Sequence, residues 1–84
     1  MIKGRHYASN ESIDFNDIPT PSGIKIDSCG GIDNKTNAPA LGWGCLISVS
    51  PDGTQKSQLF INNTMLQWRH KDGVNAWGPW KTFS

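Results

Sequence analysis

Turn-forming residues divide this chain of 84 residues into short segments. They comprise glycine and asparagine pairs, Asp-Gly steps and five prolines: Gly30-Gly31, Asn62-Asn63, Asp52-Gly53, Asp72-Gly73, and Pro19, Pro21, Pro39, Pro51 and Pro79. No stretch of ten or more residues shows the apolar period of a helix. Short segments between turn signals at this spacing predict a mainly β domain, a small antiparallel meander or sandwich of about five short strands.

The expected strands are read from alternating apolar and polar residues, and they cover residues 23–30, 42–50, 56–62, 65–70 and 77–83. Ile24 and Ile26 alternate with Lys25 and Asp27, which is the period of a half-buried strand. The clearest strand places four side chains on one face, which we expect to face the core: Trp43, Cys45, Ile47 and Val49. In the last segment Pro79 cannot donate to a ladder, so we expect an edge strand or a bulge there.

The first part of the chain differs from the rest. Residues 1–11 are polar and mixed, and we expect a connector or a loosely ordered end, followed by a single knob-like β domain over residues 12–84. Ser12 or Asp14 suits the cap of one short helical turn, with apolar anchors at Ile13, Phe15 and Ile18. Pro19 and Pro21 then prevent the helix from continuing.

Composition limits the classes of function. The net charge is +1 and the cationic residues are scattered, which argues against a nucleic-acid partner. No apolar run has the length of a membrane span, and no signal peptide is visible at the start. Only 36% of the residues are hydrophobic, so a lone domain of this size is marginal and we expect support from a partner chain or a neighbouring domain.

The two cysteines and two histidines show no spacing typical of a metal site, so we expect no metal and no cofactor. Cys29 and Cys45 are far enough apart to close a loop, but two cysteines are few for a disulfide scaffold. We expect two reduced thiols, with Cys45 buried. The acidic residues mostly sit beside turn residues and form no recognisable catalytic set, so we expect no enzymatic activity.

Five residues are the candidates for ligand binding: Trp43, Gln58, Arg69, Trp77 and Trp80. Trp77 and Trp80 lie three positions apart, and a bulge at Gly78-Pro79 would bring both to one side as a platform for a sugar ring. In the alternative, they close the core and its rim with Arg69 stacked on an indole. Arg69 and Gln58 suit either internal fasteners or ligand contacts, and Trp43 suits either a core position or a close approach by a ligand.

The ordered set of motifs resembles the pyocin-knob domains of bacteriophage tail fibres and of tail-like bacteriocin fibres. The elements are an Asn-containing turn, a "T-x-x-G" entry to a strand, an "N-x-P" loop, a "G-x-G-x-L" strand, a Gln-led strand, an Arg-bearing strand and a closing "W-x-x-W". They fall on Asn16, Thr20–Gly23, Asn37–Pro39, Gly42–Leu46 with Val49, Gln58, Arg69, and Trp77 with Trp80. One departure is that Ile24 and Lys25 stand where the family has an aromatic pair.

The resemblance implies a non-catalytic virion domain, in a fibre that is usually trimeric, with neighbouring fibre domains as partners. Its expected roles are host-surface adhesion through a bacterial glycan, or spacing within the fibre. Two other classes stay open on the residues alone. One is a peptide-recognition module that uses exposed tryptophans. The other is a thrombospondin-like repeat, for which two cysteines are few.

Overall fold

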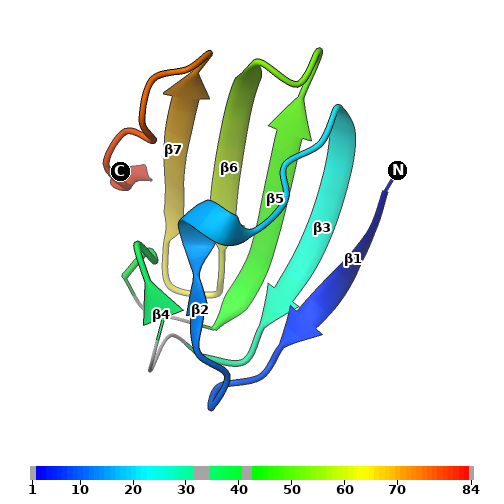
Figure 1. Cartoon of the computed structure of the whole chain (residues 1–84). Coiled ribbons are helices and arrows are strands. Elements are labelled where there is room, and N and C mark those ends of the chain that lie inside the picture. The colour runs from blue at the N-terminus through cyan, green and yellow to red at the C-terminus, as the bar shows by residue number, and fades with distance from the viewer. Residues whose placement is uncertain (1, 32–34, 41–42, 84) are drawn as a thin grey trace.

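The computed structural model describes residues 2–31, 35–40 and 43–83 (Figure 1). Its main element is a six-stranded sheet in the order β1-β3-β5-β6-β7-β8. The strands are β1 (Ile2–Tyr7), β3 (Gly23–Cys29), β5 (Gly44–Ser50), β6 (Gln55–Ile61), β7 (Leu66–Asp72) and β8 (Lys81–Phe83). A small second sheet pairs β2 (Ile13–Asp14) with β4 (Lys35–Thr36), and one 3-10 turn, η1 (Phe15–Asp17), follows β2.

Strands β3, β5, β6, β7 and β8 form the expected antiparallel meander, which confirms a mainly β fold. The Asp52-Gly53 turn joins β5 to β6. There Asp52 Oδ1 accepts hydrogen bonds from the backbone N–H groups of Thr54 and Gln55, at 2.9 and 3.2 Å. Turn chemistry of this kind fixes the register of the strands on either side.

The start of the chain corrects the sequence-based expectation. Residues 2–7 are not a loosely held end but strand β1, which pairs in parallel with β3. The register shifts between Lys3 and His6, and Gly4 lies at this irregularity. A Cβ on Gly4 would lie 1.7 Å from the carbonyl oxygen of Ile26, so only glycine allows β1 to approach β3 this closely.

The helical turn is confirmed where the sequence placed it. Asp14 is its N-cap, since Oδ1 accepts from the backbone N–H of Asn16 at 2.9 Å. Figure 1 shows β2, η1 and β4 lying across one face of the main sheet. Phe15 from the turn packs edge-on against Phe60 of β6, with ring centroids 6.3 Å apart. The buried hydrophobic cluster lies between this cover and the sheet: Tyr7, Phe15, Ile18, Cys29, Leu46 and Phe60.

The covered face of the sheet is largely the polar one, which reverses part of the prediction. One row across it consists of side chains that are all at most 6% exposed: Lys25, Ser48, Gln58 and Arg69. The predicted core face of β5 instead lies on the uncovered side, where Ile47 and Val49 are half-buried and Cys45 and Trp43 are exposed. The predicted alternation of apolar and polar residues is confirmed. The apolar side chains around η1, however, pack against the face opposite to the one that was predicted to face the core.

The expected burial of Cys45 is wrong, and the burial of Cys29, which the sequence left open, is settled. Both are free thiols, as expected, but Cys29 is buried and Cys45 is exposed. Burial raises the pKa of the Cys29 thiol to about 11. The closing strand is shorter than predicted, because β8 covers only Lys81–Phe83 and residues 73–80 are turn and coil. As Pro79 indicated, this strand lies at an edge of the sheet.

Candidate ligand-binding site

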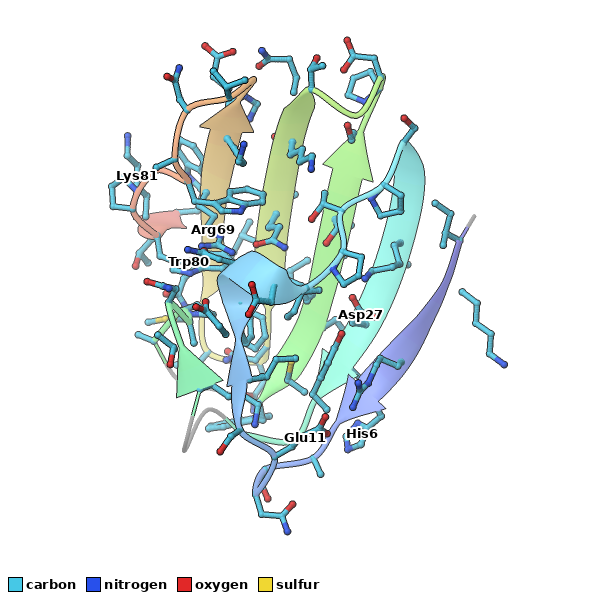
Figure 2. The ribbon with its side chains drawn as sticks, in the orientation of Figure 1. His6, Glu11, Asp27, Arg69, Trp80 and Lys81 are labelled. Carbon is cyan, nitrogen blue, oxygen red and sulfur yellow. The ribbon has the colours of Figure 1, made fainter. Side chains whose placement is uncertain are left out.

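Arg69 stands at the centre of the candidate site. Its side chain rises from β7 on the covered face and is only 2% exposed. Its Nε donates to Gln58 Oε1 on the neighbouring strand, and its Nη1 donates to Asn16 Oδ1 in η1, each at 2.7 Å. Figure 2 shows Arg69 directed toward this turn, beside Trp80. The guanidinium therefore joins the sheet to its cover.

Two indoles flank the Arg69 guanidinium. Its Cζ lies 4.2 Å from the ring centroid of Trp77 and 4.9 Å from that of Trp80. Trp80 also meets Phe15 edge-on at 6.2 Å, and its Nε1 donates to the carbonyl of Asn37 at 2.8 Å. These cation–π, edge-to-face and hydrogen-bond contacts hold the closing segment against the domain.

The segment before β8 brings the indoles of Trp77 and Trp80 to the same side of the domain. The sequence predicted a strand bulge as the cause, but the segment is coil, in which the N–H of Gly78 donates to the carbonyl of His70 at 2.9 Å. Because residues 73–80 are not a strand, Trp77 and Trp80 are free of the alternation that would point them to opposite faces.

A cavity of about 320 Å³ opens at this cluster. It is lined by Asn16, Asn37, Arg69, Trp77, Gly78, Pro79 and Trp80. Its walls thus combine two indoles, two carboxamides and a buried guanidinium. Mixed walls of this kind let a small ligand stack on an aromatic face while a few polar groups fix its orientation.

The electrostatics of the site are set by burial and by one carboxylate. Burial lowers the pKa of Arg69 to about 10, so the guanidinium stays charged at neutral pH. Among the described residues, its Nη2 is buried with no hydrogen-bond partner. Asp14 accepts from Asn37 Nδ2 at 2.9 Å, and this bond, the N–H of Asn16 and the charge of Arg69 lower the pKa of Asp14.

The structure gathers four of the five predicted residues and separates the fifth. Arg69, Trp77 and Trp80 line the cavity. Gln58 is fully buried and is linked to the cavity through its hydrogen bond with Arg69. Trp43 is 50% exposed and is absent from the cavity wall, so it is not the core residue that was the alternative expectation. Its neighbour Gly44 has φ +152°, and a Cβ there would lie 2.4 Å from the carbonyl of Ile61. The backbone, rather than a ligand, makes the close approach.

Sequence reasoning placed Asn16 and Asn37 in the family pattern but did not identify them as cavity residues. Asn16 reaches Arg69 from 53 positions away, and no local pattern reports such a contact. Asn37 adopts a positive φ of 54°, which asparagine tolerates better than most residues. The signal in the sequence was an asparagine two positions before a proline in a polar loop, which is a candidate for a shaped loop.

A second cavity, of about 440 Å³, lies at the other edge of the covered face and was not predicted. Its walls include Ile2, Arg5, Tyr7, Pro19, Pro21, Lys25 and Asp27. Lys25 Nζ lies 3.2 Å from Asp27 Oδ2, while Asp27 Oδ1 accepts from the N–H of Arg5 at 2.8 Å. The ion pair lies within β3, and the hydrogen bond from Arg5 ties Asp27 to the irregular part of β1, so the role of Asp27 in the fold is accounted for.

Within residues 2–31, 35–40 and 43–83, no group of three or more His, Cys, Asp or Glu side chains is placed to hold a metal ion. The same residues contain no helix long and apolar enough to cross a membrane. Comparison of the chain with protein-family models, with curated proteins and with solved structures finds no match.

Proposed function

We propose that this domain is a non-catalytic attachment knob of a bacteriophage or phage-like tail fibre, and that it contacts a bacterial surface glycan through the cavity at Arg69. The observation that carries the proposal is the concave site of about 320 Å³ in which Trp77 and Trp80 stand beside two asparagine side chains. The fibre context, and with it a location in the virion, is supported by the resemblance of the motifs to pyocin-knob domains.

The two asparagines suit the hydroxyl groups of a sugar. Asn16 Oδ1 accepts from Arg69, which leaves the Nδ2 group of Asn16 to donate to a ligand. Asn37 Nδ2 donates to Asp14, which leaves the Oδ1 of Asn37 to accept. A sugar hydroxyl both donates and accepts, so a donor and an acceptor at the wall of one cavity are matched to it.

The indoles supply the stacking surface. Trp77 and Trp80 are both partly exposed at the cavity, and Arg69 fixes their positions from beneath. The C–H face of a pyranose ring packs on an indole held in this way. Each such shallow site binds weakly, and the several copies carried by a fibre, a homotrimer in the resembling family, raise the avidity.

A titration against bacterial surface polysaccharides tests the proposal, with tryptophan fluorescence as the signal and a glycan array to choose the ligand. Trp77→Ala removes the stacking surface. We expect at least about a tenfold loss of affinity, because loss of a single aromatic contact at a binding site has an effect of this size. Trp43→Ala is the matched control, since this exposed indole is absent from the cavity wall, and it should bind as the unaltered chain does.

Three results would overturn the proposal. They are no binding across a broad panel of surface glycans, binding that Trp77→Ala leaves unchanged, and hydrolysis of the glycan by the purified domain. A proline-rich peptide array run in parallel tests the alternative, a peptide-recognition module that uses exposed tryptophans. Peptide binding without glycan binding would replace the adhesion proposal with that one.

A further inference from the structure

The second cavity, of about 440 Å³, is lined by β1, by β3 and by the segment that joins η1 to β3. Figure 1 shows this segment crossing the covered face of the main sheet. Pro19 and Pro21 of the segment and Ile2 and Tyr7 of β1 contribute apolar walls. The volume is within the range of about 300–1,000 Å³ that is typical of small-molecule sites.

Rigid parts of the fold shape this cavity. The register of β1 with β3 shifts between Lys3 and His6, and Gly4 in this irregular part lines the cavity. Thr20, between the two prolines, is only 5% exposed, and its Oγ1 accepts from Gln58 Nε2 at 3.4 Å. The proline rings fix φ on either side of this anchor. A wall built in this way is formed before a ligand arrives, so little free energy is lost to ordering on binding.

Two polar groups in the cavity wall have no hydrogen-bond partner among the described residues. One is the hydroxyl of Tyr7, a residue that is 2% exposed, and the other is the ammonium of Lys25, which is 6% exposed. Lys25 Nζ lies 3.2 Å from Asp27 Oδ2 as an ion pair, but these two atoms form no hydrogen bond. Because buried polar groups in proteins are nearly always hydrogen-bonded, the hydroxyl and the ammonium are both available to a ligand that accepts from them.

The charges around the cavity favour a single negative charge on that ligand. The cations of the wall are Lys3, Arg5 and Lys25, and its carboxylate belongs to Asp27. Glu11 pairs with Arg5, so two carboxylates stand against three cations and one positive charge remains. Asp27 Oδ1 accepts from the N–H of Arg5 and Oδ2 is buried, so neither oxygen is free to meet a ligand. A monoanion therefore balances the site, whereas a dianion such as phosphate exceeds it.

The two free donors and the apolar walls define the rest of the ligand. Burial and the charge of Asp27 raise the pKa of Tyr7, so its hydroxyl stays protonated at neutral pH and donates. A carboxylate accepts through two oxygens, so it suits a site that offers a hydroxyl and an ammonium. The rings of Pro19 and Pro21 give apolar surface for a compact body carried by that carboxylate.

We propose that this cavity is a second binding site, separate from the one at Arg69, and that it takes a small monocarboxylate whose body is a six-membered ring. The carboxylate accepts from Lys25 and Tyr7, and the ring packs against the prolines. Two sources have this chemistry, an acidic sugar such as a hexuronate and a non-sugar ring acid such as benzoate. The two cavities have no described lining residue in common, so this proposal does not depend on glycan binding at Arg69.

An NMR titration of the purified chain with glucuronate and, separately, with benzoate tests the proposal. At least one of the two should bind and shift the signals of Tyr7 and Lys25. Glucuronamide and benzamide are the matched ligands, since each keeps the ring and removes the charge. They should bind at least about tenfold more weakly, because hydrogen bonds to a charged group are the stronger ones. The ratio of the glucuronate and benzoate affinities identifies the source.

Two variants assign the donors. Tyr7→Phe removes a hydroxyl that forms no hydrogen bond among the described residues, so the fold should be kept while carboxylate affinity falls by about tenfold. Lys25→Met should remove the preference for the carboxylate over the amide. Lys56→Met is the matched control, since the same change is made on β6 outside the cavity wall, and it should bind as the unaltered chain does.

The proposal fails on any of three results. They are binding of neither carboxylate, equal binding of the carboxylates and their amides, and shifts confined to the indole N–H groups of Trp77 and Trp80. Lys25→Met leaves Asp27 without its ion-pair partner, so this variant is at risk of unfolding. Tyr7→Phe decides the case in that event, because a carboxylate affinity that it leaves unchanged also contradicts the proposal.

Discussion

Replacing Arg69 with methionine tests whether this buried guanidinium fastens the sheet to its cover. Methionine keeps most of the volume and can still contact the two indoles. It removes the hydrogen bonds to Gln58 Oε1 and Asn16 Oδ1. Because Gln58 is fully buried, its oxygen is left without a partner, whereas Asn16 is exposed and regains water.

The magnitude follows from these contacts. An unsatisfied buried acceptor costs about 1–3 kcal/mol. The loss of two cation–π contacts adds about 0.5–2 kcal/mol each, of which sulfur–aromatic contacts recover a part. The variant also no longer buries a charge, whose cost is seen in the lowered pKa of Arg69. This gain offsets part of the lost stability. We expect Arg69→Met to lower the free energy of unfolding by about 2–3 kcal/mol.

Urea unfolding followed by tryptophan fluorescence measures this loss. Gln58→Leu in the Arg69→Met background removes the stranded amide, so the double variant should recover about 1–2 kcal/mol relative to the sum of the single changes. A loss below about 0.5 kcal/mol for Arg69→Met, or strictly additive single changes, would refute the fastening role.

Two further predictions concern the backbone of β1 and the cap of η1. Gly4→Ala should lower the free energy of unfolding by more than about 3 kcal/mol, because its Cβ would lie 1.7 Å from the carbonyl oxygen of Ile26. The control Gly73→Ala, at φ +58°, meets no atom within 4 Å and should lower it by about 1 kcal/mol. Equal losses in thermal unfolding would contradict the close approach of β1. Hydrogen bonds from Asn37 and from the η1 backbone lower the pKa of Asp14, so its contribution to stability is present above the unfolded pKa of about 3.9 and is lost as the pH falls through the lower folded pKa. Asp14→Asn should therefore be less stable than the unaltered chain at neutral pH, with a difference that shrinks in acid; a difference that stays constant with pH would exclude this cause.

The strands could be predicted from the sequence because alternation and turn residues act locally. The segments at 23–30, 42–50, 56–62 and 65–70 correspond to β3, β5, β6 and β7, within a few residues at each end. The Asp14 cap of η1 was equally local. In each case the signal and the structure lie within a few positions of one another, so one sequence suffices.

The choice of the covered face could not be predicted from alternation. A period of two defines two faces, but it does not say which one another element will cover. Here Phe15 and Asn16 cover the polar face, and Asn16 meets Arg69 across 53 positions. Parallel pairing of β1 with β3 was missed for a similar reason, since parallel strands share no tight turn that would reveal the pairing.

Part of the candidate site was readable and part was not. Arg69, Trp77 and Trp80 were identified because aromatic and cationic residues are concentrated in the last two segments. The reason for their convergence differs from the one expected, because coil rather than a bulge precedes β8. Asn16 and Asn37 enter the site through contacts across the fold, which only the structure supplies.

The central claim is that η1 covers the polar face of the sheet, and that among the described residues Ile26, Ile47 and Leu59 lie on the opposite, uncovered face. Proton–proton contacts of the Phe15 ring in solution NMR test it most directly. The account predicts contacts from Phe15 to the rings of Phe60 and Trp80, whose centroids lie 6.3 and 6.2 Å away. Contacts from Phe15 to Ile26, Ile47 or Leu59 instead would show that the other face is covered, and would contradict the account.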